Sequence, residues 1–154
     1  MAVHGVSRST HDVDLLALDP ACLSPATWAP LKPRGVSVDI RRGDAEDPLA
    51  GVVHLAEGVA APIDLVVGRS AWQAGVLDRA TPRSIEGSLV PVASATDLIL
   101  LKLYAAGPQD AWDVEQLLSA GDRESLIAHV QMSVAELPED SRRLWARIVR
   151  PRLE

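Results

Sequence analysis

Polar and apolar residues alternate in several short stretches of the first half of the chain, which is typical of half-buried β-strands. The stretch 11–18 begins with this alternation and ends in a continuous apolar run, so we expect a strand with one solvated end and a buried remainder. Prolines are frequent in 19–34, which predicts a loop with a short helical turn. The predicted strands are residues 11–18, 36–41, 52–55 and 62–67.

Capping residues and helix-ending residues mark the later part of the chain. Ser70 is suited to cap a helix that reaches about residue 80. Residues 86–88 lie between apolar segments and predict a hairpin or strand-turn that leads into 89–92. The clearest helix is expected to begin after Thr96 as its N-cap and to end at the Gly-Pro pair 107–108. Further helices are expected at about 109–119, at 123–135 after Asp122 as the N-cap, and at 138–149.

This order of elements predicts an α/β (α+β) fold. Strands and helices mix in the first two-thirds of the chain, and helices alone occupy the final third. We expect a small mixed β-sheet flanked by helices, with a helical C-terminal part. The length of 154 residues fits a single domain 1–154, with a mixed α/β core at 1–95 and the helical part at 96–154.

The composition narrows the class of protein. Hydrophobic residues make up 47% of the chain, yet no apolar run approaches the roughly 18 residues of a membrane span. Cys22 is the only cysteine and no secretory leader is recognised, so we expect a cytoplasmic protein with no membrane partner. The net charge of −6 argues against broad nonspecific nucleic-acid binding.

Arginines crowd the C-terminal end of the chain, between residues 142 and 152. The favoured interpretation is a solvated helix face whose arginines complement the negative end of the helix dipole. The competing interpretation is a contact for an acidic partner such as RNA.

Asp12 and Asp14 are the first residues that suggest chemistry. Side chains two residues apart on a strand lie on one face, so both carboxylates are expected together, with Val13 and Leu15 in the core. Two close carboxylates repel each other unless a cation lies between them, and Mg²⁺ takes hard oxygen ligands. The pair is therefore interpreted as a magnesium site, against the alternative of an exposed strand end with two ordinary acids.

Four residues directly before these aspartates are suited to bind phosphate: Gly5, Ser7, Arg8 and Thr10. Backbone amides near Gly5, the two hydroxyl groups and the Arg8 guanidinium can together surround a triphosphate. The alternative is an ordinary polar turn before a strand. Their closeness to Asp12 in the sequence favours an NTP site.

The segment from His4 to Leu16 resembles the motif that opens nucleotidyltransferases of the minimal and abortive-infection toxin types. Residues 62–69 resemble a later strand of that family, and 97–104 with 107–114 resemble its downstream pair of helices. The similar part runs from about residue 2 to about residue 118.

This resemblance implies that Asp12 and Asp14 hold Mg²⁺, that Asp64 is a third ligand, and that an NTP is the substrate. For a toxin-type member it also implies an antitoxin partner. One departure concerns the family's Gly-Gly or Gly-Ser pair, expected upstream of His4, where the sequence has only Met1, Ala2 and Val3. The departure predicts a weakened grip on the nucleotide.

Two aspartates compete for the place of the third carboxylate. Asp39 and Asp64 both lie on predicted strands between apolar residues, where a carboxylate needs a partner. Asp64 is preferred because a helix follows it directly, as in the resembled family. The alternative for Asp39 is an ion pair with Arg41 or Arg42.

Lys102 interrupts an otherwise apolar helix. Its ammonium is interpreted either as a group that reaches the phosphates, which the resemblance favours, or as one that extends to the surface along its stem. A third interpretation pairs it with Asp110. The four histidines, at positions 4, 11, 54 and 129, show no metal-ligand spacing with one another.

Together these residues predict Mg²⁺-dependent transfer of a nucleoside monophosphate from an NTP to the hydroxyl of a small molecule, an RNA end or a protein. Asp64 would help to activate the acceptor, and Lys102 and Arg8 would offset charge on the phosphates. The alternative is a catalytically inactive, truncated nucleotidyltransferase-fold protein that binds a nucleotide or a protein. A metal-dependent nuclease ranks third.

Overall fold

The computed structural model describes His4 and residues 13–85 and 87–150, which form two compact units. One unit contains residues 13–78, and the other contains residues 79–150 together with His4. The first holds the larger β-sheet and the second holds most of the helices, so the predicted fold class, mixed α and β, is confirmed.

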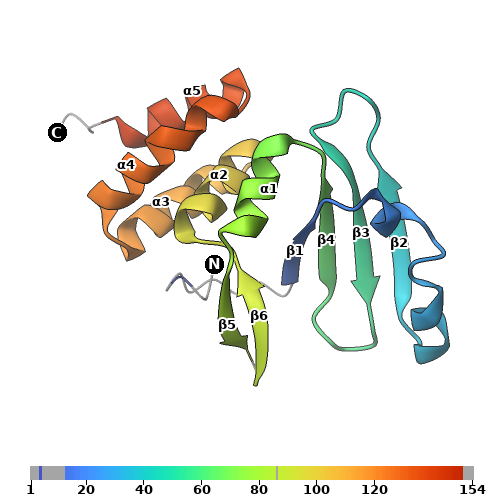
Figure 1. Cartoon of the computed structure of the whole chain (residues 1–154). Coiled ribbons are helices and arrows are strands. Elements are labelled where there is room, and N and C mark those ends of the chain that lie inside the picture. The colour runs from blue at the N-terminus through green and yellow to red at the C-terminus, as the bar shows by residue number, and fades with distance from the viewer. Residues whose placement is uncertain (1–3, 5–12, 86, 151–154) are drawn as a thin grey trace. The chain divides into compact units, whose positions relative to one another are not determined.

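The sheet of the first unit has four strands, namely β1 (Val13–Ala17), β2 (Ser37–Arg42), β3 (Leu49–Ala56) and β4 (Ile63–Gly68). Their spatial order is β1-β4-β3-β2 (Figure 1). The pair β1 and β4 is parallel, whereas the other two pairs are antiparallel. The predicted mixed sheet is therefore present. Strand β3 is longer than the predicted 52–55, and its pairing with β4 continues past an irregularity between Leu49 and Gly51 to Gly68.

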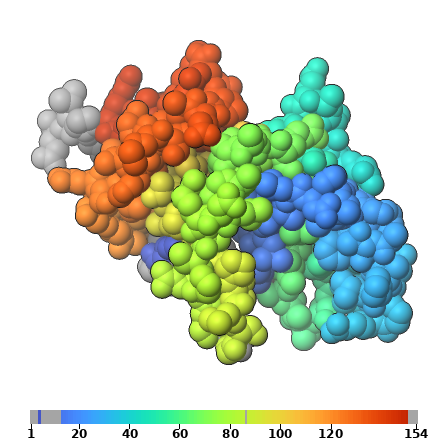
Figure 2. All heavy atoms as spheres, viewed as in Figure 1, coloured from blue at the N-terminus to red at the C-terminus, as the bar shows by residue number. Residues whose placement is uncertain are grey.

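One face of this sheet carries the apolar core of the unit. Leu23, Val53, Leu65 and Val67 are buried together on it, and Trp28 packs against them. The proline-rich segment 19–34 folds as the predicted short turns, η2 (Pro20–Leu23) and η3 (Ala29–Arg34). In Figure 2 these blue turns cover much of the strands behind them.

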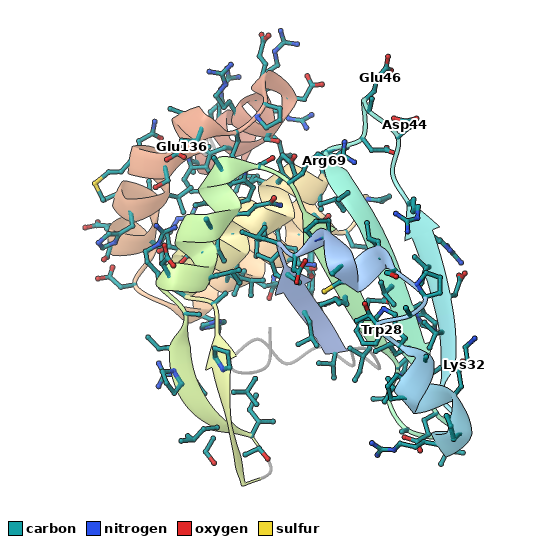
Figure 3. The ribbon with its side chains drawn as sticks, turned by 45° about the vertical axis from the view of Figure 1, so that its right-hand side comes forward. Trp28, Lys32, Asp44, Glu46, Arg69 and Glu136 are labelled. Atoms are coloured by element: carbon teal, nitrogen blue, oxygen red, sulfur yellow. The ribbon has the colours of Figure 1, made fainter. Side chains whose placement is uncertain are left out.

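The turns of segment 19–34 are fastened to the sheet by polar contacts and by close packing. The Trp28 indole donates to the Cys22 carbonyl at 2.7 Å, and Figure 3 shows this ring beside the sheet. Gly51 has no room for a side chain, since a Cβ there would lie 2.4 Å from the Arg41 carbonyl oxygen and 2.7 Å from a Leu23 methyl carbon. The segment therefore sits directly on β3. The unit ends with helix α1 (Ala71–Asp78), which begins directly after Ser70.

The prediction that Val13 and Leu15 enter the core is wrong. They lie on the core face of the sheet but are 46% and 40% exposed, respectively. The reason is the strand order, because β1 is an outer strand of the described sheet and has only β4 beside it. Residues on an outer strand have fewer neighbours than their counterparts Leu65 and Val67 on β4.

The second unit combines a hairpin with a group of helices. The hairpin joins β5 (Thr81–Ile85) to β6 (Ser88–Val92), with Gly87 at a φ of 81° in the predicted turn. The helices are α2 (Ala95–Ala105), α3 (Asp110–Ala120), α4 (Arg123–Ser133), the short η4 (Val134–Glu136) and α5 (Glu139–Val149). Helix α2 packs against α3, α4 and α5. The buried apolar residues of these helices include Ile99, Leu103, Leu117, Val130 and Trp145.

The start of α2 differs from the prediction. Ser94, not Thr96, is the N-cap, and its Oγ accepts from the Asp97 backbone N–H at 3.0 Å. Asp97 returns the interaction through its carboxylate, which accepts from the Ser94 hydroxyl at 2.7 Å and from Arg79 at 2.6 Å. In this reciprocal arrangement the Asp97 carboxylate bonds the hydroxyl of the cap, and of the two candidate caps only Ser94 lies three residues before Asp97.

Other helix boundaries agree with the prediction more closely. Asp122 caps α4 as expected, because its carboxylate accepts from the Ser125 N–H.

Within the described ranges, no helix combines the length and the apolar character that a bilayer span needs.

Candidate functional site

The predicted site residues divide into those that the structure describes and those that it does not. Asp12 and the four predicted phosphate-binding residues, Gly5, Ser7, Arg8 and Thr10, lie outside the described residues. Asp14 and Asp64 lie on the sheet of the first unit, whereas Lys102 lies on α2 of the second.

A row of four polar residues crosses the sheet on the face opposite the apolar core. Asp14 on β1 pairs with Asp64 on β4, Asp64 pairs with His54 on β3, and His54 pairs with Asp39 on β2. Directly paired residues project to the same face of a sheet, while their sequence neighbours project to the other. We call Asp14, Asp64, His54 and Asp39 the polar row.

Asp14 and Asp64 are neighbours in this row. Their strands are parallel and in register, so their backbones are separated by one strand spacing, about 4.8 Å. Carboxylates on adjacent strands of one face repel each other, and a cation near both would offset the repulsion. Neither residue is buried, so a ligand has access to them.

His54 contacts Asp64 directly. The ring Nδ1 lies 2.6 Å from the Asp64 Oδ1, and the side chains are 43% and 34% exposed. An ionised carboxylate can only accept, so the ring donates from Nδ1 in this hydrogen bond. The bond therefore fixes the position of one carboxylate oxygen.

His54 was not among the predicted site residues, because the four histidines show no metal-ligand spacing with one another. A usable signal is present in the sequence. Strands β3 and β4 flank a turn in which Gly58 has a φ of 52°, and a hairpin centred near this glycine places His54 opposite Asp64.

Asp39 lies at the far end of the polar row and has a different partner. It is three strand spacings from β1, about 14 Å at 4.8 Å per strand, and so is distant from Asp14. Its carboxylate accepts from Arg41 Nε at 2.9 Å, which is the alternative that the sequence analysis gave for it. Of the two aspartates considered as the third metal ligand, Asp64 is the one that is paired with Asp14.

Lys102 forms ion pairs with two aspartates of α3. Its Nζ lies 3.0 Å from Asp110 and 3.0 Å from Asp113. The Asp113 side chain is 0% exposed and that of Asp110 is 12% exposed. Burial lowers the pKa of Lys102, but the hydrogen bonds to Asp113 and Asp110 and their charges outweigh it, so the pKa is raised above its ordinary value. Its ammonium is thus charged and joins α2 to α3, and the proposed pairing with Asp110 is present.

The acidic turn between β2 and β3 is explained by local structure. The Asp44 carboxylate accepts from the backbone N–H groups of Glu46 and Asp47, and Arg69 donates to the Asp44 carbonyl at 2.8 Å. Figure 3 shows Asp44 and Glu46 on this turn. These contacts stabilise a turn and give no reason to assign a ligand to it.

The arginines of α5 are exposed, as the sequence analysis expects for a solvated helix face. Arg143 pairs with Glu139 one turn earlier and lies 3.9 Å from Asp140. Arg142, Arg147 and Arg150 are also exposed. The interpretation as a contact for an acidic partner stays a prediction.

The donors of the polar row fit magnesium in type. Among the residues that the structure describes, no group of three His, Cys, Asp or Glu side chains is arranged to hold a metal ion. Mg²⁺, however, is commonly bound through one or two carboxylates together with waters and substrate phosphates. Asp14 and Asp64 supply two such carboxylates on one accessible sheet face.

The sequence matches no protein-family model and no curated protein.

Proposed function

We propose that the protein is a Mg²⁺-dependent nucleotidyltransferase that moves a nucleoside monophosphate from an NTP to an acceptor hydroxyl. The observation that carries this proposal is the parallel, in-register pairing that places Asp64 beside Asp14. The motif around Asp14 resembles one in which two aspartates of a strand and a third of a later strand share a metal. A neighbouring pair of carboxylates on an accessible face is what such chemistry requires.

In this proposal Asp14 and Asp64 hold the metal together with Asp12, which is two residues before Asp14 in the same motif. When bound, Mg²⁺ would neutralise charge on the triphosphate as the bond to pyrophosphate breaks. The protein's own contribution is to fix its carboxylates on a rigid sheet, so that little reorganisation is needed. Gly5, Ser7, Arg8 and Thr10 are proposed to hold the phosphates.

The acceptor and the partner are also part of the proposal. The acceptor is proposed to be a hydroxyl of a small molecule, an RNA end or a protein side chain. The resemblance to toxin-type enzymes adds the proposal that the chain acts as a toxin whose partner is an antitoxin.

One observation favours the alternative, a catalytically inactive module that binds a nucleotide or a protein. Lys102, which the resemblance assigns to the phosphates, is held by Asp110 and Asp113. A role at the phosphates would require the ammonium to leave two carboxylates, one of which is fully buried. Lys102 is therefore the least supported member of the proposed site.

The test is calorimetric binding of a panel of NTPs, with and without Mg²⁺, to the wild-type chain and to the variants Asp14→Ala and Asp64→Ala. Asp39→Ala is the matched control, since it removes a carboxylate from the same row that lies beside Arg41. We expect Mg²⁺-dependent binding in the wild type and the control, and its loss in the other two.

Transfer is then assayed with labelled NTPs and mixed acceptors, and it should follow the same order among the variants. NTP binding that ignores Mg²⁺, or an Asp14→Ala variant that keeps the wild-type response, would contradict the proposal. Nucleotide binding without transfer would support the inactive module instead.

A further inference from the structure

The position of His54 in the sheet determines which carboxylates its ring can reach. It has an aspartate on each side, Asp39 on β2 and Asp64 on β4. The Asp39 carboxylate is bound by Arg41, which is two residues later on the same strand and face. The imidazole is bonded to Asp64 at 2.6 Å.

This bond places a constraint on the carboxylate that lies beside Asp14. Asp64 rotates about two side-chain torsions, and repulsion from Asp14 would drive it away from any geometry in which both face one cation. The N–H of the ring bonds Oδ1 and so holds this oxygen toward His54 on β3. Oδ2 is the oxygen of Asp64 that this bond does not engage. A carboxylate that binds a metal is commonly oriented in this way by a hydrogen bond from a neighbouring residue.

We propose that His54 is a positioning residue that holds the Asp64 carboxylate in the orientation needed to share a divalent cation with Asp14. This inference rests on the proposed function, because it assigns His54 a role at the same metal site. The role belongs to the Nδ1–H donor and not to the ring as a whole. It therefore makes a distinct prediction for side chains that keep or remove that donor.

Asparagine and leucine are suited to separate these cases at position 54. The amide nitrogen of asparagine is as many bonds from the backbone as Nδ1, so His54→Asn retains a donor toward Asp64. Leucine has nearly the shape of asparagine, so His54→Leu differs from His54→Asn mainly in lacking the donor. His54→Ala removes the side chain beyond Cβ. Asp39→Asn is the matched control, because it alters the other neighbour of His54 and leaves Asp64 in place.

The experiment measures Mn²⁺ binding by electron paramagnetic resonance, with Mn²⁺ alone as the probe, and the Mg²⁺ dependence of NTP binding by calorimetry. Both are recorded at one pH, and thermal melts confirm that each variant is folded. We expect His54→Leu and His54→Ala to weaken metal affinity by about tenfold, the usual effect of removing such a partner. His54→Asn should stay within about threefold of the wild type because the hydrogen bond is retained.

Different outcomes overturn different statements. Wild-type metal affinity in His54→Leu would overturn the positioning role while leaving the magnesium site intact. Equal losses in His54→Asn and His54→Leu would also overturn it, because the ring rather than the donor would then matter. A wild-type protein that binds neither Mn²⁺ nor Mg²⁺–NTP would overturn the proposed function, and the role of His54 with it.

Discussion

Replacement of Lys102 by methionine removes the cation that lies between two acidic side chains of α3. The methionine keeps most of the length and apolar stem of lysine, so the main change is the loss of charge. Asp113 is fully buried, and its carboxylate lies 3.0 Å from the lysine nitrogen. Its negative charge would then be less compensated in a place where water does not reach it.

The expected magnitude follows from this burial. Removal of one partner of a buried ion pair typically costs about 3–5 kcal/mol. Lys102 is 23% exposed and Asp110 12% exposed, which lets water screen part of the change, so we expect about 3 kcal/mol, the lower end of that range. In an Asp113→Asn background the same substitution should cost much less, since the buried charge is already gone.

The assay is urea unfolding followed by far-UV circular dichroism and by tryptophan fluorescence. With a urea dependence of about 2 kcal/mol per molar, a loss of about 3 kcal/mol lowers the midpoint by about 1.5 M. Coincident curves from the two probes are needed for a two-state treatment. Lys32→Met is the matched control, because Lys32 is exposed on η3, and it should change the free energy of unfolding by less than about 0.5 kcal/mol.

The pH dependence gives this prediction a sign. The pKa of Lys102 is raised in the folded protein, so the folded state holds this proton more tightly than the unfolded state. Its contribution is complete below the ordinary lysine pKa of about 10.4 and is lost as pH rises through the higher folded pKa. The difference between wild type and Lys102→Met should be constant up to about pH 10 and shrink above it. A urea midpoint of Lys102→Met equal to that of the wild type at neutral pH would refute the reasoning about the buried ion pair.

Two further predictions concern the backbone. Ser94→Ala should destabilise the protein by about 1 kcal/mol in urea unfolding through loss of the α2 cap, whereas Thr96→Ala should be nearly neutral; the reverse order would restore Thr96 as the cap. Gly51→Ala should cost about 1–3 kcal/mol, since its Cβ would meet the Arg41 carbonyl oxygen at 2.4 Å. A Gly51→Ala variant with the melting temperature of the wild type would contradict this prediction, because β3 would then have moved aside without cost.

Much of the architecture was predictable because local patterns specify local structure. The period-two alternation of 36–41 and the mixed pattern of 62–67 predict strands that the structure places at Ser37–Arg42 and Ile63–Gly68. Gly87 and Asp122 mark a turn and a cap through their own backbone and side-chain chemistry. Residues two apart on one strand share a face, so the orientation of Asp64 away from Leu65 was also local information.

The capping residue of α2 shows where local reasoning ends. Ser94 and Thr96 are both acceptable N-caps by residue type. The choice depends on where the chain leaves β6 and on the reciprocal bonds among Ser94, Asp97 and Arg79. Arg79 is 18 residues away from Asp97 in the sequence, so no short window contains the full arrangement.

The sequence by itself determined the approximate positions of most strands, helices and turns, and which side chains of a strand share a face, because these depend largely on neighbours a few positions away. Only the tertiary structure decided strand order and register. These place Asp64 between Asp14 and His54, separate Asp39 from Asp14, and leave Val13 at an outer strand. The physical reason is that hydrogen bonds between strands join residues distant in the chain, and their register is set by the packing of the whole sheet.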